Sequence, residues 1–352
     1  MVQAKEPNIV GSGADYKLSD VREPSERPKF GALPHTVGVV FEGGGFRGHY
    51  TEGVFDVWLE EGIGATHTVG VSAGATFGCN FKSCQLGRAV RYNKRFCNDP
   101  RYAGMRSLLT TGNLFNREFA FGRLPWELDV FDVGTYAANP MRFTVVATDI
   151  QTGEPVYHDV NRGDVEDVEW MRASSAIPAL SRPVELEGRL LLDGGTADSI
   201  PFRWMLDQGY DRCVVVCTQP EGYRKEPNGL MPALRVLLHR YPKLVELLAN
   251  RHERYNVQLD ELARLEREGK VFVIRPSESV KTPLSVKDPA ILDRVYQVGR
   301  RDGKATLDAL RSYLGDVTGR QLCRVKLSRP RQGDSCAGLN CLTQDRETVV
   351  PG

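Results

Sequence analysis

Six short apolar runs recur between residues 36 and 276, and segments with helical character separate them. Each run is long enough for one buried strand, and the intervening segments carry apolar residues at helical spacing. Such alternation is typical of a parallel sheet with helices on both faces. We therefore predict an α/β fold, a three-layer α/β/α arrangement with a mostly parallel central sheet, with strands at 36–41, 66–71, 141–150, 188–195, 213–218 and 270–276.

The segments between these runs predict the helices and the domain order. After residue 218 the pattern becomes mainly helical. We therefore expect an α/β core at 35–218 and a mainly helical C-terminal extension at 219–316 that packs on the core. Residues 1–34, rich in Pro, Gly, Ser and charge, predict a mobile arm, and residues 317–352 predict a tail. The expected helices span 48–61, 73–96, 165–176, 201–208, 232–269 and 289–314.

Composition narrows the class of protein. Of the 352 residues 41% are hydrophobic and 26% charged, and the net charge of +1 argues against a nucleic-acid partner. No apolar signal segment and no run of ~18 apolar residues occurs, which predicts a cytoplasmic protein without a transmembrane segment. A basic stretch at 320–331 is interpreted as a solvated tail, with contact to an anionic membrane surface as the alternative. Five cysteines in apolar segments are expected to be structural thiols, and Cys336 and Cys341 to be exposed.

A glycine-rich loop, EGGGFRG, follows the first run. Gly43, Gly45 and Gly48 match the dinucleotide pattern G-x-G-x-x-G, but the same backbone could hold an oxyanion. A dinucleotide site needs an acidic residue about 20 positions later, at the end of the second strand. That strand instead runs into glycines, and Glu60 and Glu61 lie in the helix before it. We therefore favour the oxyanion interpretation.

The second run ends in Gly70-Val71-Ser72-Ala73-Gly74, a G-x-S-x-G pattern between a strand and a helix. This is the setting of a nucleophile elbow, in which flanking glycines permit a tight turn that exposes the serine hydroxyl. The N–H of Ala73 would point the same way. The loop at Gly43–Gly45 would supply donors to the oxygen that becomes negative when Ser72 attacks a carbonyl, and Arg47 would fix the loop or add positive potential.

The serine also needs a base. His239 and His252 follow in triad order but lie in helical patterns, and His49 fits a helix N-terminus. Asp193 ends an apolar run and precedes Gly194 and Gly195, which suits a carboxylate at the carboxyl edge of the sheet, although an Asp in a local turn fits equally well.

These motifs together resemble the patatin-like phospholipase family, in particular its bacterial members with a helical C-terminal extension. The resemblance covers roughly residues 37–218 and continues more weakly to about 315. It implies a Ser72–Asp193 dyad in place of a triad, and an oxyanion hole built from Gly43, Gly44, Gly45, Phe46, Arg47 and Gly48. The motifs that carry it are GGGFRG at 43–48, GVSAG at 70–74, VVATDIQTGEPV at 145–156 and ASSAIPALSRPVELEGRLLLDGG at 173–195.

The resemblance also implies a reaction: hydrolysis of fatty-acyl carboxylic esters of phospholipids, lysophospholipids or neutral lipids through an acyl-enzyme. No cofactor and no metal are expected, because no residue cluster has metal-ligand spacing. A solvated Asp with a pKa of ~3.9 is a weak base, so burial must raise the pKa of Asp193. Two alternatives stay open, a non-catalytic lipid- or partner-binding protein and a histidine-dependent esterase.

Four aromatic residues are expected in the buried core, or in an acyl groove or flap: Phe119, Phe121, Trp126 and Phe131.

Overall fold

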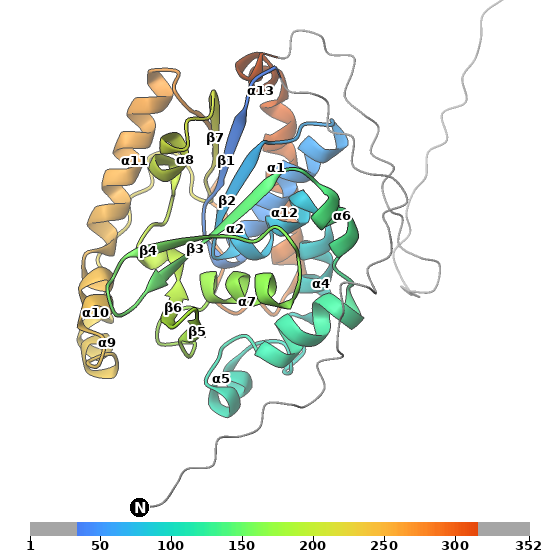
Figure 1. Cartoon of the computed structure of the whole chain (residues 1–352). Coiled ribbons are helices and arrows are strands. Elements are labelled where there is room, and N and C mark those ends of the chain that lie inside the picture. The colour runs from blue at the N-terminus through green and yellow to red at the C-terminus, as the bar shows by residue number, and fades with distance from the viewer. Residues whose placement is uncertain (1–33, 316–352) are drawn as a thin grey trace, which may run out of the picture.

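The structure, a computed structural model, describes residues 34–315, which build one eight-stranded sheet with helices on both faces (Figure 1). The strand order is β5-β6-β3-β2-β1-β7-β8, and β4 pairs with β3. Strands β1, β2, β3, β7 and β8 are parallel, so the prediction of a mostly parallel α/β sheet is confirmed. The strands are β1 (Val37–Phe41), β2 (His67–Val71), β3 (Arg142–Asp149), β4 (Pro155–Asp159), β5 (Val184–Leu186), β6 (Arg189–Asp193), β7 (Arg212–Val216) and β8 (Phe272–Ile274).

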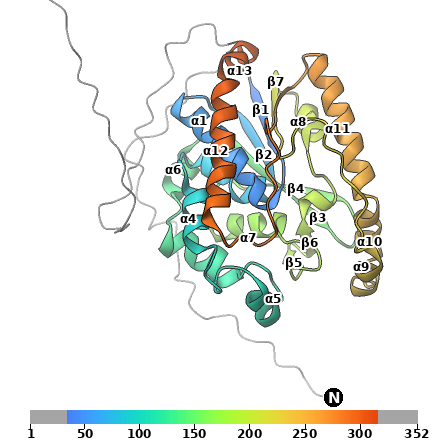
Figure 2. The same ribbon diagram turned by 180° about the vertical axis from the view of Figure 1, so that it is seen from behind.

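Alternating residues of β1 face two different helical layers, as the period of a strand requires. Val39 and Phe41 pack under α1 (Gly48–Glu60) and α12 (Pro289–Ala305), whereas Val40 packs against the layer of α8 (Phe202–Asp207) and α11 (Arg251–Arg267). Figures 1 and 2 show these two layers on opposite sides of the sheet. The helical extension is therefore divided between both faces, because α11 covers one and α12 the other.

The sheet is not wholly parallel, and this detail brings two distant segments together. Val146 of β3 pairs with Val71 of β2 on one edge and with Tyr157 of β4 on the other. The next residue, Ala147, pairs with β4 and also with Asp193 at the end of the antiparallel β6. Strands β2 and β6 therefore share one edge of β3 and meet end to end, so that the residue after Val71 lies beside Asp193.

Three of the long predicted helices are wrong as continuous elements. The segment 73–96 contains α2 (Ala73–Thr76), α3 (Cys79–Lys82) and α4 (Arg88–Phe96). The break between α3 and α4 occurs because Cys84 and Gly87 adopt positive φ values of 55° and 61° that a right-handed helix excludes. The segment 232–269 breaks into α9 (Met231–Leu237), α10 (Pro242–Ala249) and α11, since Pro242 begins a new helix. The C-terminal pattern likewise divides into α12 and α13 (Leu307–Leu314).

Other elements carried too weak a periodicity to be predicted. These include the partly exposed β4, the three-residue β5 and a π-helix, η3 (Glu118–Leu128), in the aromatic segment. Pro201 precedes α8 and does not begin its first turn, contrary to the prediction. The remaining helices are α5 (Met105–Thr111), α6 (Val133–Ala138) and α7 (Val165–Ser174).

Several predictions concern residues outside the described range. Outside it lie residues 1–33 of the N-terminal arm, the basic stretch at 320–331, Cys336 and Cys341. The five other candidate thiols, Cys79, Cys84, Cys97, Cys213 and Cys217, are buried and free, as predicted. Between residues 34 and 315, no helix combines the length and the apolar character needed to cross a bilayer.

Candidate active site

Ser72 occupies a strained turn between β2 and α2. Its φ of 55° and ψ of −116° lie in a region that L-residues rarely adopt. The turn needs glycine on both sides: a Cβ on Gly70 would lie 2.2 Å from the carbonyl oxygen of Gly74, and one on Gly74 would lie 2.3 Å from that of Phe41. The turn directs the Ser72 hydroxyl into a cavity at the carboxyl edge of the sheet.

The Ser72 hydroxyl donates a hydrogen bond of 2.6 Å to Oδ2 of Asp193. Asp193 ends β6, and its other oxygen accepts the N–H of Gly195 at 2.8 Å. Gly194 permits the turn, because a Cβ there would lie 2.0 Å from the carbonyl oxygen of Val146. The end-to-end arrangement of β2 and β6 thus joins two residues that are 121 positions apart.

Burial is the main influence on Asp193, whose side chain is almost fully enclosed. Desolvation raises the pKa of this carboxyl above its ordinary value, and three groups oppose the rise: the Ser72 hydroxyl, the Arg251 guanidinium and the Gly195 N–H. A carboxylate with a raised pKa is a stronger base than a solvated one.

The glycine loop faces Ser72 across the same cavity. Gly43, Gly44, Gly45, Phe46 and Arg47 all line it. Within residues 34–315 the N–H groups of Gly43 and Gly44 donate no hydrogen bond, so both are available to a bound oxygen. Gly45 adopts a φ of 56°, which turns the loop into the 3-10 helix η2 (Gly45–Arg47) ahead of α1.

Close packing against the elbow positions this loop. A Cβ on Gly43 would lie 3.0 Å from the Cβ of Ser72, and a Cβ on Gly48 would lie 2.7 Å from that of Ala73. Gly48 therefore lets α1 begin directly against α2. Any larger residue at either position would push the loop away from Ser72.

Aromatic and aliphatic side chains form much of the rest of the cavity, whose volume is about 410 Å³. Of the four predicted aromatic residues, Phe121 lines it, Phe119 and Phe131 are buried in the core and Trp126 packs against the core. Phe121 therefore fits the predicted acyl groove, and the other three residues fit the predicted core. The other main apolar lining residues are Phe77, Tyr92, Tyr102, Phe115, Ile177, Leu234 and Leu248.

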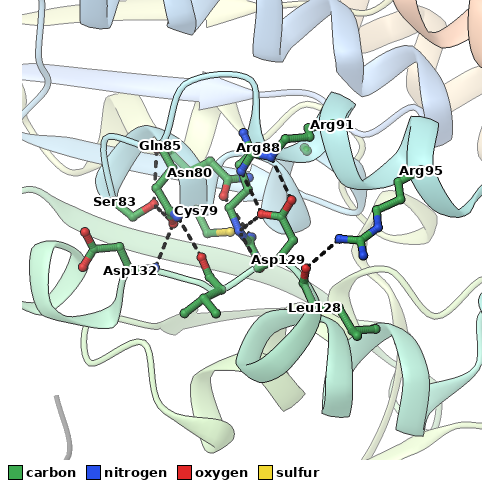
Figure 3. Close-up of polar contacts among 12 residues, drawn as sticks. Cys79, Asn80, Ser83, Gln85, Arg88, Arg91, Arg95, Leu128, Asp129 and Asp132 are labelled. Atoms are coloured by element: carbon green, nitrogen blue, oxygen red, sulfur yellow. Dashed lines mark hydrogen bonds and ion pairs between the residues drawn. The ribbon is translucent and has the colours of Figure 1, made fainter. Parts of the chain in front are cut away.

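A polar network joins α3 and α4 to the segment around Asp129 (Figure 3). The buried Arg88 of α4 donates to the carbonyl oxygen of Asp129, directly after η3, and to Oδ1 of Asn80. Arg91 forms two hydrogen bonds of 2.8 Å with the Asp129 carboxylate. These contacts tie the end of η3 to α3 and α4, so that Phe121 and Tyr92 keep their places in the cavity.

The candidate histidines are not bonded to the Ser72–Asp193 pair. His49 is buried in α1, where it stacks on Phe77 with ring centroids 4.6 Å apart and bonds to Glu52. His239 is exposed and bonds to the carbonyl oxygen of Val236. In the described part of the chain no histidine ring is hydrogen-bonded to Ser72 or Asp193.

The two carboxylates considered for a dinucleotide, Glu60 and Glu61, point toward the C-terminal helices. They form ion pairs of 2.6 Å with Arg300 and Arg311. Neither lines the cavity beside the glycine loop. No group of three potential metal ligands occurs within residues 34–315.

Four residues of the candidate site escaped the sequence analysis. Ser174 accepts the N–H of Ser72 at 3.0 Å and donates to the carbonyl oxygen of Val146, which braces the elbow. Glu42, Lys225 and Arg251 line the cavity. Of these four residues, only Ser174 and Glu42 lie in motifs quoted above. No local pattern marks Lys225 or Arg251, because both belong to the extension.

Comparison with known proteins agrees with this geometry. A family model described as patatin-like phospholipase matches residues 39–205, which contain the glycine loop, the elbow and Asp193. Over these residues the chain is similar to the patatin-like phospholipase family. A second model, a domain of unknown function (DUF6363), matches residues 241–315, within the helical extension of this patatin-like chain.

Several curated proteins align with most of this patatin-like chain. The uncharacterized protein YjjU of Escherichia coli is 28% identical over 307 residues, which cover 84% of this chain and 83% of YjjU. The uncharacterized NTE family protein Mb2594 of Mycobacterium bovis is 28% identical over 310 residues, but the match spans only 50% of that protein. Lysophospholipase NTE1 of Coccidioides immitis is 28% identical over 306 residues, 80% of this chain and 18% of the fungal protein.

Proposed function

We propose that this chain is a serine lipid acyl hydrolase that cleaves fatty-acyl carboxylic esters, with Ser72 as nucleophile and Asp193 as base. Similarity to the patatin-like phospholipase family supports a lipid hydrolase in general terms. The observation that carries the finer assignment is the hydrogen bond of 2.6 Å from the Ser72 hydroxyl to the buried Asp193. The name of the fungal relative, a lysophospholipase, favours lysophospholipids among the ester substrates.

In the first half of the proposed reaction, Ser72 Oγ attacks the ester carbonyl carbon while Asp193 accepts the hydroxyl proton. The carbonyl oxygen becomes negative and faces the free N–H groups of Gly43 and Gly44, which stabilise the tetrahedral intermediate. Collapse of this intermediate breaks the ester bond. Asp193 returns the proton to the leaving alkoxide, and the acyl group stays on Ser72.

The second half repeats these steps with water. Asp193 accepts a proton from a water molecule that attacks the acyl-enzyme, and the same N–H groups stabilise the second intermediate. Collapse releases the fatty acid and restores the Ser72 hydroxyl. The acyl chain would lie along the apolar wall formed by Tyr92, Phe115 and Phe121.

Labelling with a fluorophosphonate, followed by intact mass measurement and peptide mapping, tests the proposal. We expect one adduct on Ser72 in the wild type, no adduct in Ser72→Ala and strongly slowed labelling in Asp193→Asn. His239→Ala and His252→Ala serve as matched controls and should label at the wild-type rate. Loss of labelling in either histidine variant would favour a histidine-dependent esterase, and absence of any adduct would favour a non-catalytic lipid-binding protein.

A further inference from the structure

Three basic side chains line the cavity without a direct salt bridge: Arg47, Lys225 and Arg251. Within residues 34–315 none of them forms an ion pair within 4.0 Å, whereas arginines such as Arg142 and Arg224 do. Nε of Arg47 is buried without a hydrogen-bond partner. Nζ of Lys225 lies 4.9 Å from the centre of the Tyr255 ring, and Arg251 donates from Nε to the carbonyl oxygen of Gly195 at 2.6 Å.

The two carboxylates of the cavity are engaged elsewhere. Glu42 accepts the Tyr255 hydroxyl and the Thr218 N–H, both at 2.5 Å. Asp193 accepts Ser72 and Gly195. Burial raises the pKa of both carboxyls, and Arg47 opposes this rise at Glu42 and Arg251 at Asp193, without a contact within 4.0 Å.

The positive charge of this group is strong enough to affect its own members. The pKa of Lys225 is lowered to about 8, first by burial and then by repulsion from Arg251 and Arg47. Repulsion among buried cations is relieved by a bound anion. A cavity with these properties is suited to an anionic group that arrives with the ligand.

The cations and the aromatic wall lie toward different helices. Arg251 begins α11, and Lys225 stays close to that helix through hydrogen bonds between its backbone and Asn256. Tyr92 belongs to α4 and Phe121 to η3. Figures 1 and 2 show α11 and α4 on opposite sides of the sheet. Ser72 and Asp193 lie at the ends of β2 and β6.

We propose that Lys225, Arg251 and Arg47 bind a phosphate group on the head of the substrate, so that the cavity prefers acyl esters with a phosphomonoester head to neutral acyl esters. This inference rests on the proposed hydrolysis at Ser72. With the acyl chain against the aromatic wall, the alcohol half of the ester extends toward α11. Guanidinium groups match phosphate oxygens in bidentate geometry, and Lys225 supplies a point charge.

The kinetic test compares two esters with the same acyl chain, 1-oleoyl-glycerol 3-phosphate and 1-oleoyl-glycerol. We expect Lys225→Gln to lower the ratio of their kcat/KM values by about 10-fold or more, because one charge-assisted contact to phosphate is lost. Lys225→Arg should restore most of the ratio. Arg224→Gln is the matched control, since the exposed neighbour Arg224 pairs with Asp260 outside the cavity and its loss should leave the ratio unchanged.

Two kinetic results would overturn the inference. One is an unchanged ratio in Lys225→Gln, and the other is faster hydrolysis of 1-oleoyl-glycerol, or of the corresponding phosphocholine ester, than of the phosphomonoester by the wild type.

A binding measurement separates this inference from the proposed hydrolysis. Isothermal titration of Ser72→Ala with octyl phosphate, octyl glucoside and inorganic phosphate should show the tightest binding for octyl phosphate. A second substitution, Lys225→Gln, should weaken it about 10-fold or more. Equal affinity for inorganic phosphate and octyl phosphate would assign the site to free phosphate and overturn the head-group role. Lys225-dependent binding of octyl phosphate in a protein that hydrolyses no ester would support the phosphate site and reject the hydrolase.

Discussion

Backbone strain at Ser72 predicts how substitutions of this residue change the free energy of unfolding. A φ of 55° costs an L-residue on the order of 1–3 kcal/mol, and glycine avoids most of this cost. We expect Ser72→Gly to have a larger free energy of unfolding than Ser72→Ala, by about 1–2 kcal/mol, as measured by urea denaturation. Both variants should be inactive.

The matched comparison uses Ser312, which is exposed in the helix α13. There Ser312→Gly should be less stable than Ser312→Ala by roughly 0.5–1 kcal/mol, because glycine weakens a helix. The same order of stability at both sites would show that Ser72 is not strained.

The raised pKa of Asp193 predicts how the reaction depends on pH. The base must be a carboxylate, so kcat/KM should fall as the pH drops through an apparent pKa above the ordinary value of ~3.9, and should be level at higher pH. Asp193→Asn should lower kcat by about 10²–10⁴-fold and remove this acidic limb. Initial rates with a soluble ester between pH 4 and 9 measure the profile.

A result at odds with this prediction is an acidic limb near pH 6.5 that persists in Asp193→Asn. Such a limb would indicate a histidine as the base. The matched variant is His252→Ala, which should keep the wild-type profile.

Among the structural elements, η3 depends on one buried arginine. The Arg88 guanidinium donates to the Asp129 backbone and to Asn80, and it packs on the rings of Tyr92 and Phe131. Arg88→Met keeps the apolar stem but leaves buried acceptors unpaired, so we expect the free energy of unfolding to fall by about 3 kcal/mol. Urea denaturation provides the measurement.

Arg91→Met is the control at the same residue, Asp129. Arg91 is 49% exposed, so water partly screens its ion pair with the Asp129 carboxylate, and Arg91→Met should cost less than Arg88→Met. If both substitutions cost the same, Arg88 does not anchor the wall. Loss of the anchor should also reduce the preference for long acyl chains, because Phe121 would no longer be held in the cavity.

At the scale of the whole molecule, the extension is joined to the core by close contact of α12 with α1. A Cβ on Gly299 would lie 2.0 Å from the carbonyl oxygen of Tyr50, and a Cβ on Gly53 would lie 2.3 Å from that of Tyr296. Gly299→Ala must therefore separate the two helices. We expect it to lower the free energy of unfolding by about 1–3 kcal/mol in a single transition of core and extension, measured by calorimetry.

Gly229→Ala is the control, because a Cβ there meets open space. A separate transition for the extension in Gly299→Ala would contradict a single cooperative unit. It would also detach Arg251 and Lys225 from the rest of the cavity.

Much of the fold and of the candidate site could be predicted from local sequence. The run at 36–41 became β1, and the Ser72 and Asp193 motifs lie at strand ends, because apolar runs and glycines act over a few residues. The break at Cys84 could not be predicted, since a positive φ at a non-glycine residue depends on its surroundings. The register of β4 and β6 on β3 could not be predicted from the sequence either.

The sequence by itself determined the α/β class, the elbow, the glycine loop and the identity of the two residues that meet. Tertiary structure alone decided that β6 runs antiparallel and ends against β2, which joins Ser72 to Asp193 across 121 positions. It also decided that Lys225 and Arg251 enter the cavity from the extension. The physical reason is range: apolar period and glycine conformation are properties of neighbouring residues, whereas strand register and burial of charge arise from packing between segments far apart in the chain.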